Sequence, residues 1–163
     1  MSRVVWTTLQ SRHRLVVDAP RKMADTLSKR ARSERMSLVR GKNTKVELTV
    51  RSLVHKLGYR YGLHAGDIPG KPDLVFRPRR KVIFIHGCFW HRHSRCKLAR
   101  LPKSRLGFWL PKLNGNRERD RKIRRALSEL GWRSLVIWEC QLGNSASLRK
   151  KVSAFLGHKG VRI

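Results

Sequence analysis

Acidic residues are scarce in this 163-residue chain, which has 10 Asp and Glu against 39 Lys and Arg and a net charge of +29 at pH 7. So few carboxylates cannot neutralise the basic side chains, which excludes a protein whose charges balance internally. An imbalance of this size is typical of proteins that bind a polyanion, and phosphate contacts would make the affinity fall steeply with salt. The alternative is a solvated basic surface that has no partner. Charge alone does not separate DNA from RNA, or an enzyme from a packaging protein.

Long hydrophobic runs are also missing. An uninterrupted apolar stretch such as residues 82–85 is far too short to span a bilayer. Residues 1–17 contain scattered arginines and lack the apolar segment and small-residue cleavage site of an export signal. Because hydrophobic residues still make up 40% of the chain, we expect one domain with a genuine core. These features predict a cytoplasmic protein that has no membrane partner.

Cysteine occurs only three times, and an odd number of cysteines is a poor disulfide framework. Two of the cysteines flank a histidine-rich run, and the third ends an apolar stretch. Structural zinc takes four nitrogen or sulfur ligands in a tetrahedron. We therefore predict a structural Zn²⁺ site made by Cys88, His93, Cys96 and Cys140. The alternative is three buried free thiols beside a solvated histidine cluster.

Hydrophobic periodicity and turn residues divide the chain into a basic arm and an α/β domain. Residues 1–42 lack sustained periodicity and are rich in Lys and Arg, so we expect a partly disordered N-terminal arm ahead of a domain at 43–163. Thr44 to Glu47 has the form of a capping box that opens a helix, and Gly58 ends this helix. The expected fold class is α/β, with a mixed central sheet flanked by helices and a parallel last strand. The remaining expected elements are strands at 59–64, 73–76, 81–85 and 134–139, and helices at 117–130 and 147–156.

The candidate catalytic residues follow a rigid Pro-Gly loop at residues 69–72. Asp73 begins a strand after this loop, a position suited to holding Mg²⁺ against a phosphate, although a cap on a turn is its structural alternative. His86 ends the adjacent strand across from Asp73, and His91 follows in the predicted zinc segment. A carboxylate with two histidines is suited to phosphodiester hydrolysis, because an imidazole titrates near neutral pH and can transfer a proton. Glu47 is a further candidate to act on the water, with the capping box as its structural alternative.

Several motifs follow one another in an order that resembles one protein family. They are R-G-K-N-T-K-V-E-L, I-P-G-K-P-D-L-V-F, K-V-I-F-I-H-G-C-F-W-H-R-H, F-W-L-P-K-L and G-W-R-S-L-V-I-W-E-C, and the similarity covers about residues 23–157. This run of motifs resembles the very short patch repair (Vsr) DNA mismatch endonucleases. Several specific motifs in the same order are stronger evidence for a family than one short match. Residues 1–22 lie outside the resemblance, and Ile85 occupies a position where family members often have Thr.

The resemblance implies a restriction-endonuclease-like core, in which the tripeptide at 84–86 replaces the usual second acid and lysine. Asp73 would bind Mg²⁺ together with the backbone carbonyl of Ile85, so the different side chain at that position should leave activity intact. His86 and His91 would assist water activation and protonation of the leaving group. The complete catalytic set that the resemblance implies is Glu47, Asp73, His86 and His91, beside a structural zinc site.

The resemblance also implies the substrate and the partners. The family nicks one strand of duplex DNA on the 5′ side of the thymine in a T:G mismatch, which starts the repair of deaminated 5-methylcytosine. A monomeric bacterial enzyme associated with the nucleoid is therefore expected, with a functional link to a cytosine-5 DNA methyltransferase. Two alternatives stay open: a zinc-stabilised DNA-binding protein without catalysis, and another nuclease of the same core, such as a junction resolvase or a restriction enzyme.

Aromatic residues of the zinc segment and of the stretch after it are implied to contact DNA. The family wedges aromatic side chains into the duplex beside the mismatch, and Phe89, Trp90 and Trp109 match these positions. A wobble pair is easier to unstack than a matched pair, so an inserted ring can recognise the mismatch. Without the resemblance, core packing would be expected for these rings, as it is for Trp132 and Trp138. Two further positions match DNA contacts of the family: Lys112 and Asn116.

Overall fold

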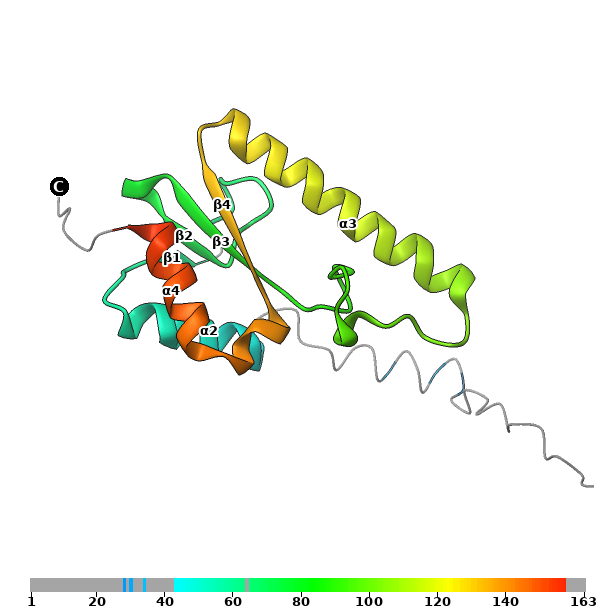
Figure 1. Cartoon of the computed structure of the whole chain (residues 1–163). Helices are drawn as coiled ribbons and strands as arrows, with labels where there is room; N and C mark the ends of the chain where they lie inside the picture. Colours follow the sequence, from blue (N-terminus) through cyan, green and yellow to red (C-terminus); the bar gives the residue numbers. More distant parts are fainter. Residues whose placement is uncertain (1–27, 29, 31–33, 35–42, 64, 158–163) are drawn as a thin grey trace, which may run out of the picture.

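The computed structural model describes residues 43–63 and 65–157, together with Ser28, Arg30 and Glu34 (Figure 1). The basic arm predicted at 1–42 therefore lies almost entirely outside the described residues. No helix in the described part of the chain is long and apolar enough to cross a membrane.

The described part of the domain alternates strands and helices in the expected α/β order. Each helix and strand expected after residue 43 is present, although several begin or end at different residues. The helices are α2 (Lys45–Lys56), α3 (Leu106–Glu129) and α4 (Ser145–Leu156), and the strands are β1 (Gly62–Leu63), β2 (Leu74–Phe76), β3 (Lys81–His86) and β4 (Arg133–Trp138). Short 3₁₀ turns occupy Arg77–Arg79, Lys97–Ala99 and Glu139–Gly143.

The strands form one mixed sheet in the order β1-β2-β3-β4. β2 pairs antiparallel with β1 and with β3, which confirms the predicted hairpin. β4 pairs with β3 in parallel, with His86 opposite Trp138 at the ends of the two strands. The predicted mixed sheet with a parallel last strand is therefore confirmed.

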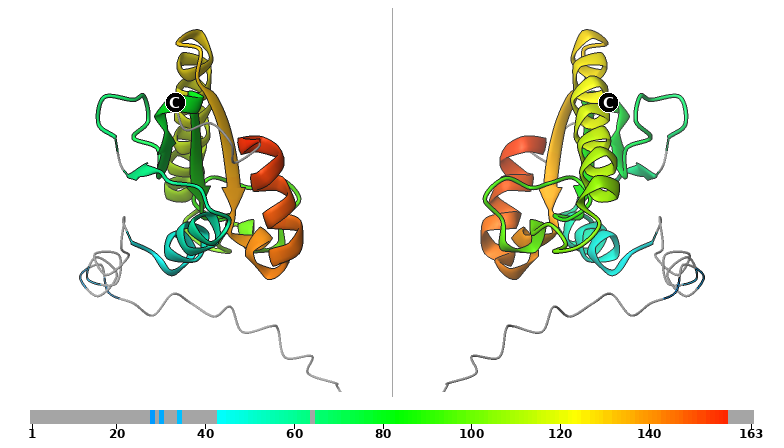
Figure 2. Two further views of the ribbon diagram at one scale, coloured as in Figure 1. Left: turned by 90° about the vertical axis from the view of Figure 1, so that its left-hand side faces the viewer. Right: turned by 90° about the vertical axis from the view of Figure 1, so that its right-hand side faces the viewer.

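Helices cover both faces of the sheet, so the domain has three layers (Figures 1 and 2). α2 and α4 pack on one face and α3 packs on the other. Two buried clusters join the layers. The first contains Val50, Leu53 and Val54 of α2, Leu148, Val152 and Leu156 of α4, and Leu74, Phe76, Ile83 and Ile137 of the sheet. The second joins Leu127 of α3 to Val75, Val82 and Phe84.

Helix α3 begins eleven residues earlier than the predicted helix at 117–130, and it contains Pro111. A proline inside a helix removes one backbone hydrogen bond, so local propensity disfavours a helix around Pro111. Leu113 is only 1% exposed, however, so the first half of α3 buries an apolar side chain. Packing of this kind outweighs local propensity in most protein helices.

Strand β1 is shorter than the strand predicted at 59–64, because only Gly62 and Leu63 pair with β2. Tyr59 lies outside the sheet, where its hydroxyl donates a hydrogen bond to the carbonyl of Gly157 at 2.7 Å. His64 lies outside the described residues. This part of the prediction was wrong about the length of the strand, because Tyr59 packs in the core without joining the sheet.

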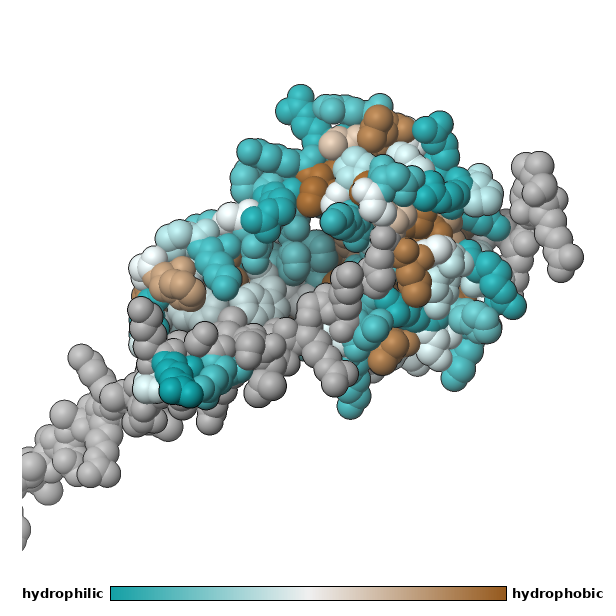
Figure 3. Space-filling view, turned by 180° about the vertical axis from the view of Figure 1, so that it is seen from behind, coloured by the Kyte–Doolittle hydropathy of each residue, from teal (hydrophilic) through white to brown (hydrophobic). Residues whose placement is uncertain are grey.

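Several large hydrophobic residues remain exposed, and two of them, Leu106 and Phe108, lie at the start of α3. Figure 3 shows hydrophilic side chains over much of the back of the molecule, with hydrophobic residues in separate places. Phe108 is among the most exposed of the hydrophobic residues, with 52% of its surface accessible.

The loop before β2 packs directly on α3 and fixes the start of that strand. Gly70 has a φ of +80°, and Lys71 follows with a φ of 48°. A Cβ atom added at Gly70 would collide with the side chain of Ile123 on α3. This close approach places Asp73, at the end of the loop, between the sheet and α3.

Substitution of Gly70 by Ala should destabilise the domain by more than about 1 kcal/mol, because φ is positive and Ile123 occupies the space. Gly66→Ala is the matched control, since nothing lies within 4 Å of its added Cβ. We expect Gly66→Ala to change stability by no more than about 0.5 kcal/mol. Urea denaturation of both variants measures the difference, and equal stabilities would contradict the packing described here.

Candidate functional site

The candidate catalytic residues gather where β3 and β4 end and β2 begins. Because β2 runs antiparallel to β3, Asp73 lies at the same edge of the sheet as His86. The Oδ2 atom of Asp73 accepts a hydrogen bond from the backbone N–H of Ile85 at 2.7 Å. The carboxylate is thereby held against β3, one residue before His86.

A cavity of about 300 Å³ opens at this edge, between the sheet and α3. Asp73, His86 and His91 all line it, so the structure brings together the carboxylate and the two imidazoles that the sequence predicts. We name this hollow the catalytic cavity. Its remaining lining residues are Gly70, Lys71, Phe84, Ile85, Arg119, Asp120, Ile123, Arg124 and Val136.

Asp120 of α3 is the site residue that the sequence analysis missed. Its Oδ2 atom lies 2.6 Å from Nδ1 of His91 and 3.9 Å from Nδ1 of His86. The two imidazole rings stack, with centroids 3.7 Å apart and an interplanar angle of 12°. Ligand atoms of these three side chains lie within 4.8 Å of one another, close enough to hold one metal ion.

The sequence did contain a signal for Asp120. Lys112 and Asn116 were predicted to contact DNA, and Asp120 follows at the same four-residue spacing on α3. Residues at this spacing share one face of a helix. Because arginines surround Asp120 in the sequence, the segment was interpreted as a solvated helix face and Asp120 was not selected as a site residue.

Burial, together with the charges of His91 and Arg124, lowers the pKa of His86 to about 4 against the opposing effect of Asp120. His86 is therefore neutral at pH 7 and can accept a proton. Burial raises the pKa of Asp120, but the hydrogen bond with His91 and the charges of His91, His86 and Arg124 together outweigh burial and leave the pKa below its usual value. An ionised carboxylate only accepts hydrogen bonds, so Nδ1 of His91 donates a hydrogen bond to Asp120.

Glu47 is absent from the described residues that line the catalytic cavity. It lies on α2, where it is 4% exposed and its carboxylate forms an ion pair with Arg51. Its backbone N–H donates to Oγ1 of Thr44 at 3.2 Å, which confirms Thr44 as the N-cap of the helix. The structure thus supports Thr44 as the cap of this helix, and a catalytic role for Glu47 stays a prediction.

The four predicted zinc ligands form a second cluster next to the catalytic cavity. Nδ1 of His93 lies 3.6 Å from Sγ of Cys88 and 3.4 Å from Sγ of Cys140, and all four ligand atoms lie within 4.8 Å of one another. Burial raises the pKa of Cys88 to about 12, so a cation is needed to stabilise its thiolate. The group, which we call the Cys/His cluster, is suited to hold a metal ion and consists of Cys88, His93, Cys96 and Cys140.

Trp138 lies between the Cys/His cluster and the catalytic cavity. Its ring stacks on His93, with centroids 4.1 Å apart and an interplanar angle of 8°. Its edge contacts the ring of His86, with centroids 5.3 Å apart. The expectation that Trp138 belongs to the core was wrong. Its half-buried ring packs against these two histidines at the end of β4. Trp132 does pack against the core, as expected.

The residues predicted to contact DNA also gather in one place. The ring centroid of Phe89 lies 5.1 Å from that of Trp90 and 5.3 Å from that of Trp109. The ammonium of Lys112 lies 5.7 Å from the centroid of Trp90, and the amide of Asn116 donates to the carbonyl of Trp90 at 3.1 Å. The three rings are half-buried and belong to neither buried cluster of the core. We call this group the aromatic cluster.

Phe108 extends the aromatic cluster, although the sequence analysis did not select it. Its ring centroid lies 5.2 Å from that of Trp109, and the ammonium of Lys112 lies 5.5 Å from its centre. The guanidinium of Arg105 lies 5.7 Å from the same ring. An exposed aromatic ring between two cations is suited to contact a base and the phosphates beside it.

Carboxylates and imidazoles around one cavity, on a strongly basic α/β protein, define a class: a nucleic-acid-cleaving enzyme. Comparisons with known proteins agree with this class. The family described as DNA mismatch endonuclease Vsr matches residues 24–97.

Curated relatives cover most of the chain. The type II nicking enzyme V.XorIIP of Xanthomonas oryzae is 48% identical over 134 residues, which are 82% of this chain and 98% of the relative. The DNA mismatch endonuclease Vsr of Escherichia coli is 43% identical over 120 residues, 74% of this chain and 76% of the relative. The type II nicking enzyme V.NmeAIP of Neisseria meningitidis is 40% identical over 131 residues, 80% of this chain and 93% of the relative. The chain belongs to the Vsr family of DNA mismatch endonucleases and is a DNA endonuclease.

Replacement of Asp120 by Asn should lower the nicking rate by about 10²- to 10⁴-fold, the usual contribution of acid–base catalysis. The amide removes the negative charge that holds the Nδ1–H tautomer of His91. Glu118→Gln is the matched control, because Glu118 is an exposed acid of the same helix that pairs with Arg121. Single-turnover nicking of a mismatched duplex measures both rates. Wild-type activity in Asp120→Asn would show that the carboxylate takes no part in catalysis.

Proposed function

We propose that this protein is a magnesium-dependent endonuclease that nicks one strand on the 5′ side of the thymine in a T:G mismatch. The nick would start the repair of deaminated 5-methylcytosine. The observation that carries the proposal is the catalytic cavity, where Asp73, His86, His91 and Asp120 meet, with His91 next in the chain to Trp90 of the aromatic cluster. The names of the relatives, a mismatch endonuclease and nicking enzymes, support the same reaction.

The residues of the catalytic cavity fit a magnesium ion. Mg²⁺ prefers oxygen ligands and completes its shell with water and substrate phosphate. The carboxylate of Asp73 and the backbone carbonyl of Ile85 would hold it, at the point where the Asp73–Ile85 hydrogen bond joins the loop to β3. Bound there, the metal would neutralise charge that develops on the phosphate and activate a water molecule.

Two histidines of the cavity are proposed to carry out separate proton transfers. His86 is neutral at pH 7 and lines the cavity together with Asp73, so it would take the proton from the attacking water by its position. His91 is oriented by Asp120 and is suited to protonate the departing 3′ oxygen. The stacked rings keep both imidazoles on one side of the cavity. Glu47, whose carboxylate pairs with Arg51, stays a candidate to act on the attacking water.

Mismatch recognition is assigned to the aromatic cluster. Phe89, Trp90 and Trp109 form a partly exposed group of rings, and Lys112 and Asn116 lie beside them. Inserting rings between base pairs costs least where the pair is weak, as in a T:G wobble. Lys112 and Asn116 can then donate hydrogen bonds to base edges or phosphates at the opened step.

The Cys/His cluster is proposed to hold structural zinc. Bonds of about 2.3 Å to sulfur and about 2.0 Å to nitrogen at a tetrahedral angle separate the two ligand atoms by about 3.5 Å. The distances of 3.6 Å and 3.4 Å from His93 to Cys88 and Cys140 agree with this value. Zinc would fix the loop that carries Phe89, Trp90 and His91.

The proposed reaction also has consequences for the domain, the oligomeric state and the partner. Residues 43–163 would form the endonuclease domain on a restriction-endonuclease-like core, acting as a monomer. Because 5-methylcytosine must be made before it can deaminate, a cytosine-5 DNA methyltransferase would supply the precursor of the substrate.

Replacement of Asp73 by Ala should preserve duplex binding and lower the nicking of T:G duplexes by about 10³-fold or more, because the metal loses its carboxylate. Asp67→Ala is the matched control, since the side chain of Asp67 is 60% exposed and pairs with the surface residue Arg77. Nicking of T:G, U:G and matched duplexes with Mg²⁺ measures the effect. Tight binding without nicking by the wild type would favour a DNA-binding protein, and equal cutting of matched duplex would favour a restriction enzyme.

A further inference from the structure

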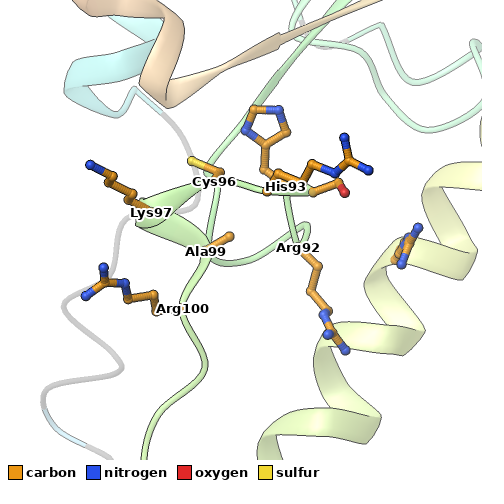
Figure 4. Close-up of a pocket in the computed structure, with 9 residues that line it drawn as sticks. Arg92, His93, Cys96, Lys97, Ala99 and Arg100 are labelled. Carbon is orange, nitrogen blue, oxygen red and sulfur yellow. The ribbon is translucent and has the colours of Figure 1, made fainter.

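A second hollow, of about 470 Å³, lies between the loop that follows Cys88 and helix α3 (Figure 4). Five of its lining residues are cations, and none of the residues that line it is acidic. We call it the basic cavity. It is lined by Arg92, His93, Ser94, Arg95, Cys96, Lys97, Ala99, Arg100 and Arg117.

The cations of the basic cavity have no acidic partner within the described part of the chain. Other cations of α3 do have such partners: Arg121 pairs with Glu118 and Arg125 pairs with Glu129. Like charges that gather without a carboxylate repel one another, which costs stability unless an anion binds among them. The local charge therefore predicts an anionic ligand at this place.

The loop that carries most of these cations has an unusual backbone and is tied to α3. Arg92 and Arg95 have φ values of 50° and 55°, a left-handed conformation that is unusual for arginine. The guanidinium of Arg92 donates to Oδ1 of Asn114 on α3 at 2.6 Å, which ties the loop to the helix. The backbone N–H of His93 donates to the carbonyl of Cys88 at 3.0 Å, so the Cys/His cluster and the basic cavity share one loop.

The directions of the side chains indicate what kind of anion fits. Figure 4 shows Arg92 pointing toward α3, whereas Lys97 and Arg100 point to the opposite side of the loop. The positive charges are therefore spread along the loop and do not converge on one point. A row of phosphates fits this arrangement better than a single small anion.

We propose that the basic cavity and its rim bind the phosphate backbone of duplex DNA, independently of the base sequence. The proposal rests on the proposed function for its ligand and adds a second contact region beside the aromatic cluster. Because the same loop carries the Cys/His cluster, binding of the metal would also shape this contact. Each phosphate neutralised adds about 0.9 to the slope of log affinity against log salt for B-form DNA.

The test compares two double variants that each lose one lysine and one arginine. Lys97→Gln/Arg100→Gln removes two exposed cations of the basic cavity. Arg133→Gln/Lys150→Gln removes two exposed cations at the start of β4 and on α4, which do not line the cavity. Affinity for a fully matched duplex is measured at several salt concentrations without added Mg²⁺, so that no nicking is involved.

We expect the first pair to weaken binding and to lower the salt slope by about 1 to 2, and the control pair to lower it by less than half as much. Equal slopes in the two double variants would overturn the proposal, because they would show that only net charge matters. Arg117→Gln on α3 provides a variant outside the loop, and it should lower the slope by about 1. Failure of the wild type to nick T:G duplex would refute the proposed function but would leave this comparison of slopes intact.

Discussion

The parallel pairing of β3 with β4 is the constraint on which the arrangement of the site depends. Its register sets His86 opposite Trp138, so the residues that follow both strands leave the sheet at the same edge. Cys88 follows β3 and Cys140 follows β4, which is why ligands 52 positions apart in the chain meet in one cluster. Trp138 then lies between this cluster and His86. A different register would separate the Cys/His cluster and remove the support of the catalytic imidazole.

Helix α3 completes the site from the other side of the cavity. One face of it carries Lys112 at the aromatic cluster, Asn116 at the backbone of Trp90, and Asp120 at His91. The same helix packs on the sheet through Leu127 and on the loop before β2 through Ile123. A single rigid element therefore sets the distance between the residues proposed to recognise DNA and those proposed to cleave it. The four-residue spacing places the residues proposed for recognition and the residue proposed for catalysis on the same face of α3.

Most of the fold and much of the site could be predicted from the sequence, because the signals were local. A few consecutive residues are enough to predict the structure at Thr44, at the Pro-Gly loop and in the Cys-His run. The early start of α3 could not be predicted, since Pro111 argues against a helix and the burial of Leu113 is a tertiary effect. Asp120 was missed for a similar reason: its partners, His86 and His91, lie about thirty residues away in sequence. Trp138 looked like a core residue until its histidine neighbours were known.

The most direct test of the central claim is anomalous diffraction from crystals with a T:G duplex, with Mn²⁺ in place of Mg²⁺. Data at the manganese and zinc edges locate both metals in one experiment. The account predicts a manganese peak beside Asp73 and the carbonyl of Ile85, and a separate zinc peak among Cys88, His93, Cys96 and Cys140. A duplex bound with no manganese beside Asp73 would contradict the assignment of the catalytic cavity as the centre of phosphodiester cleavage.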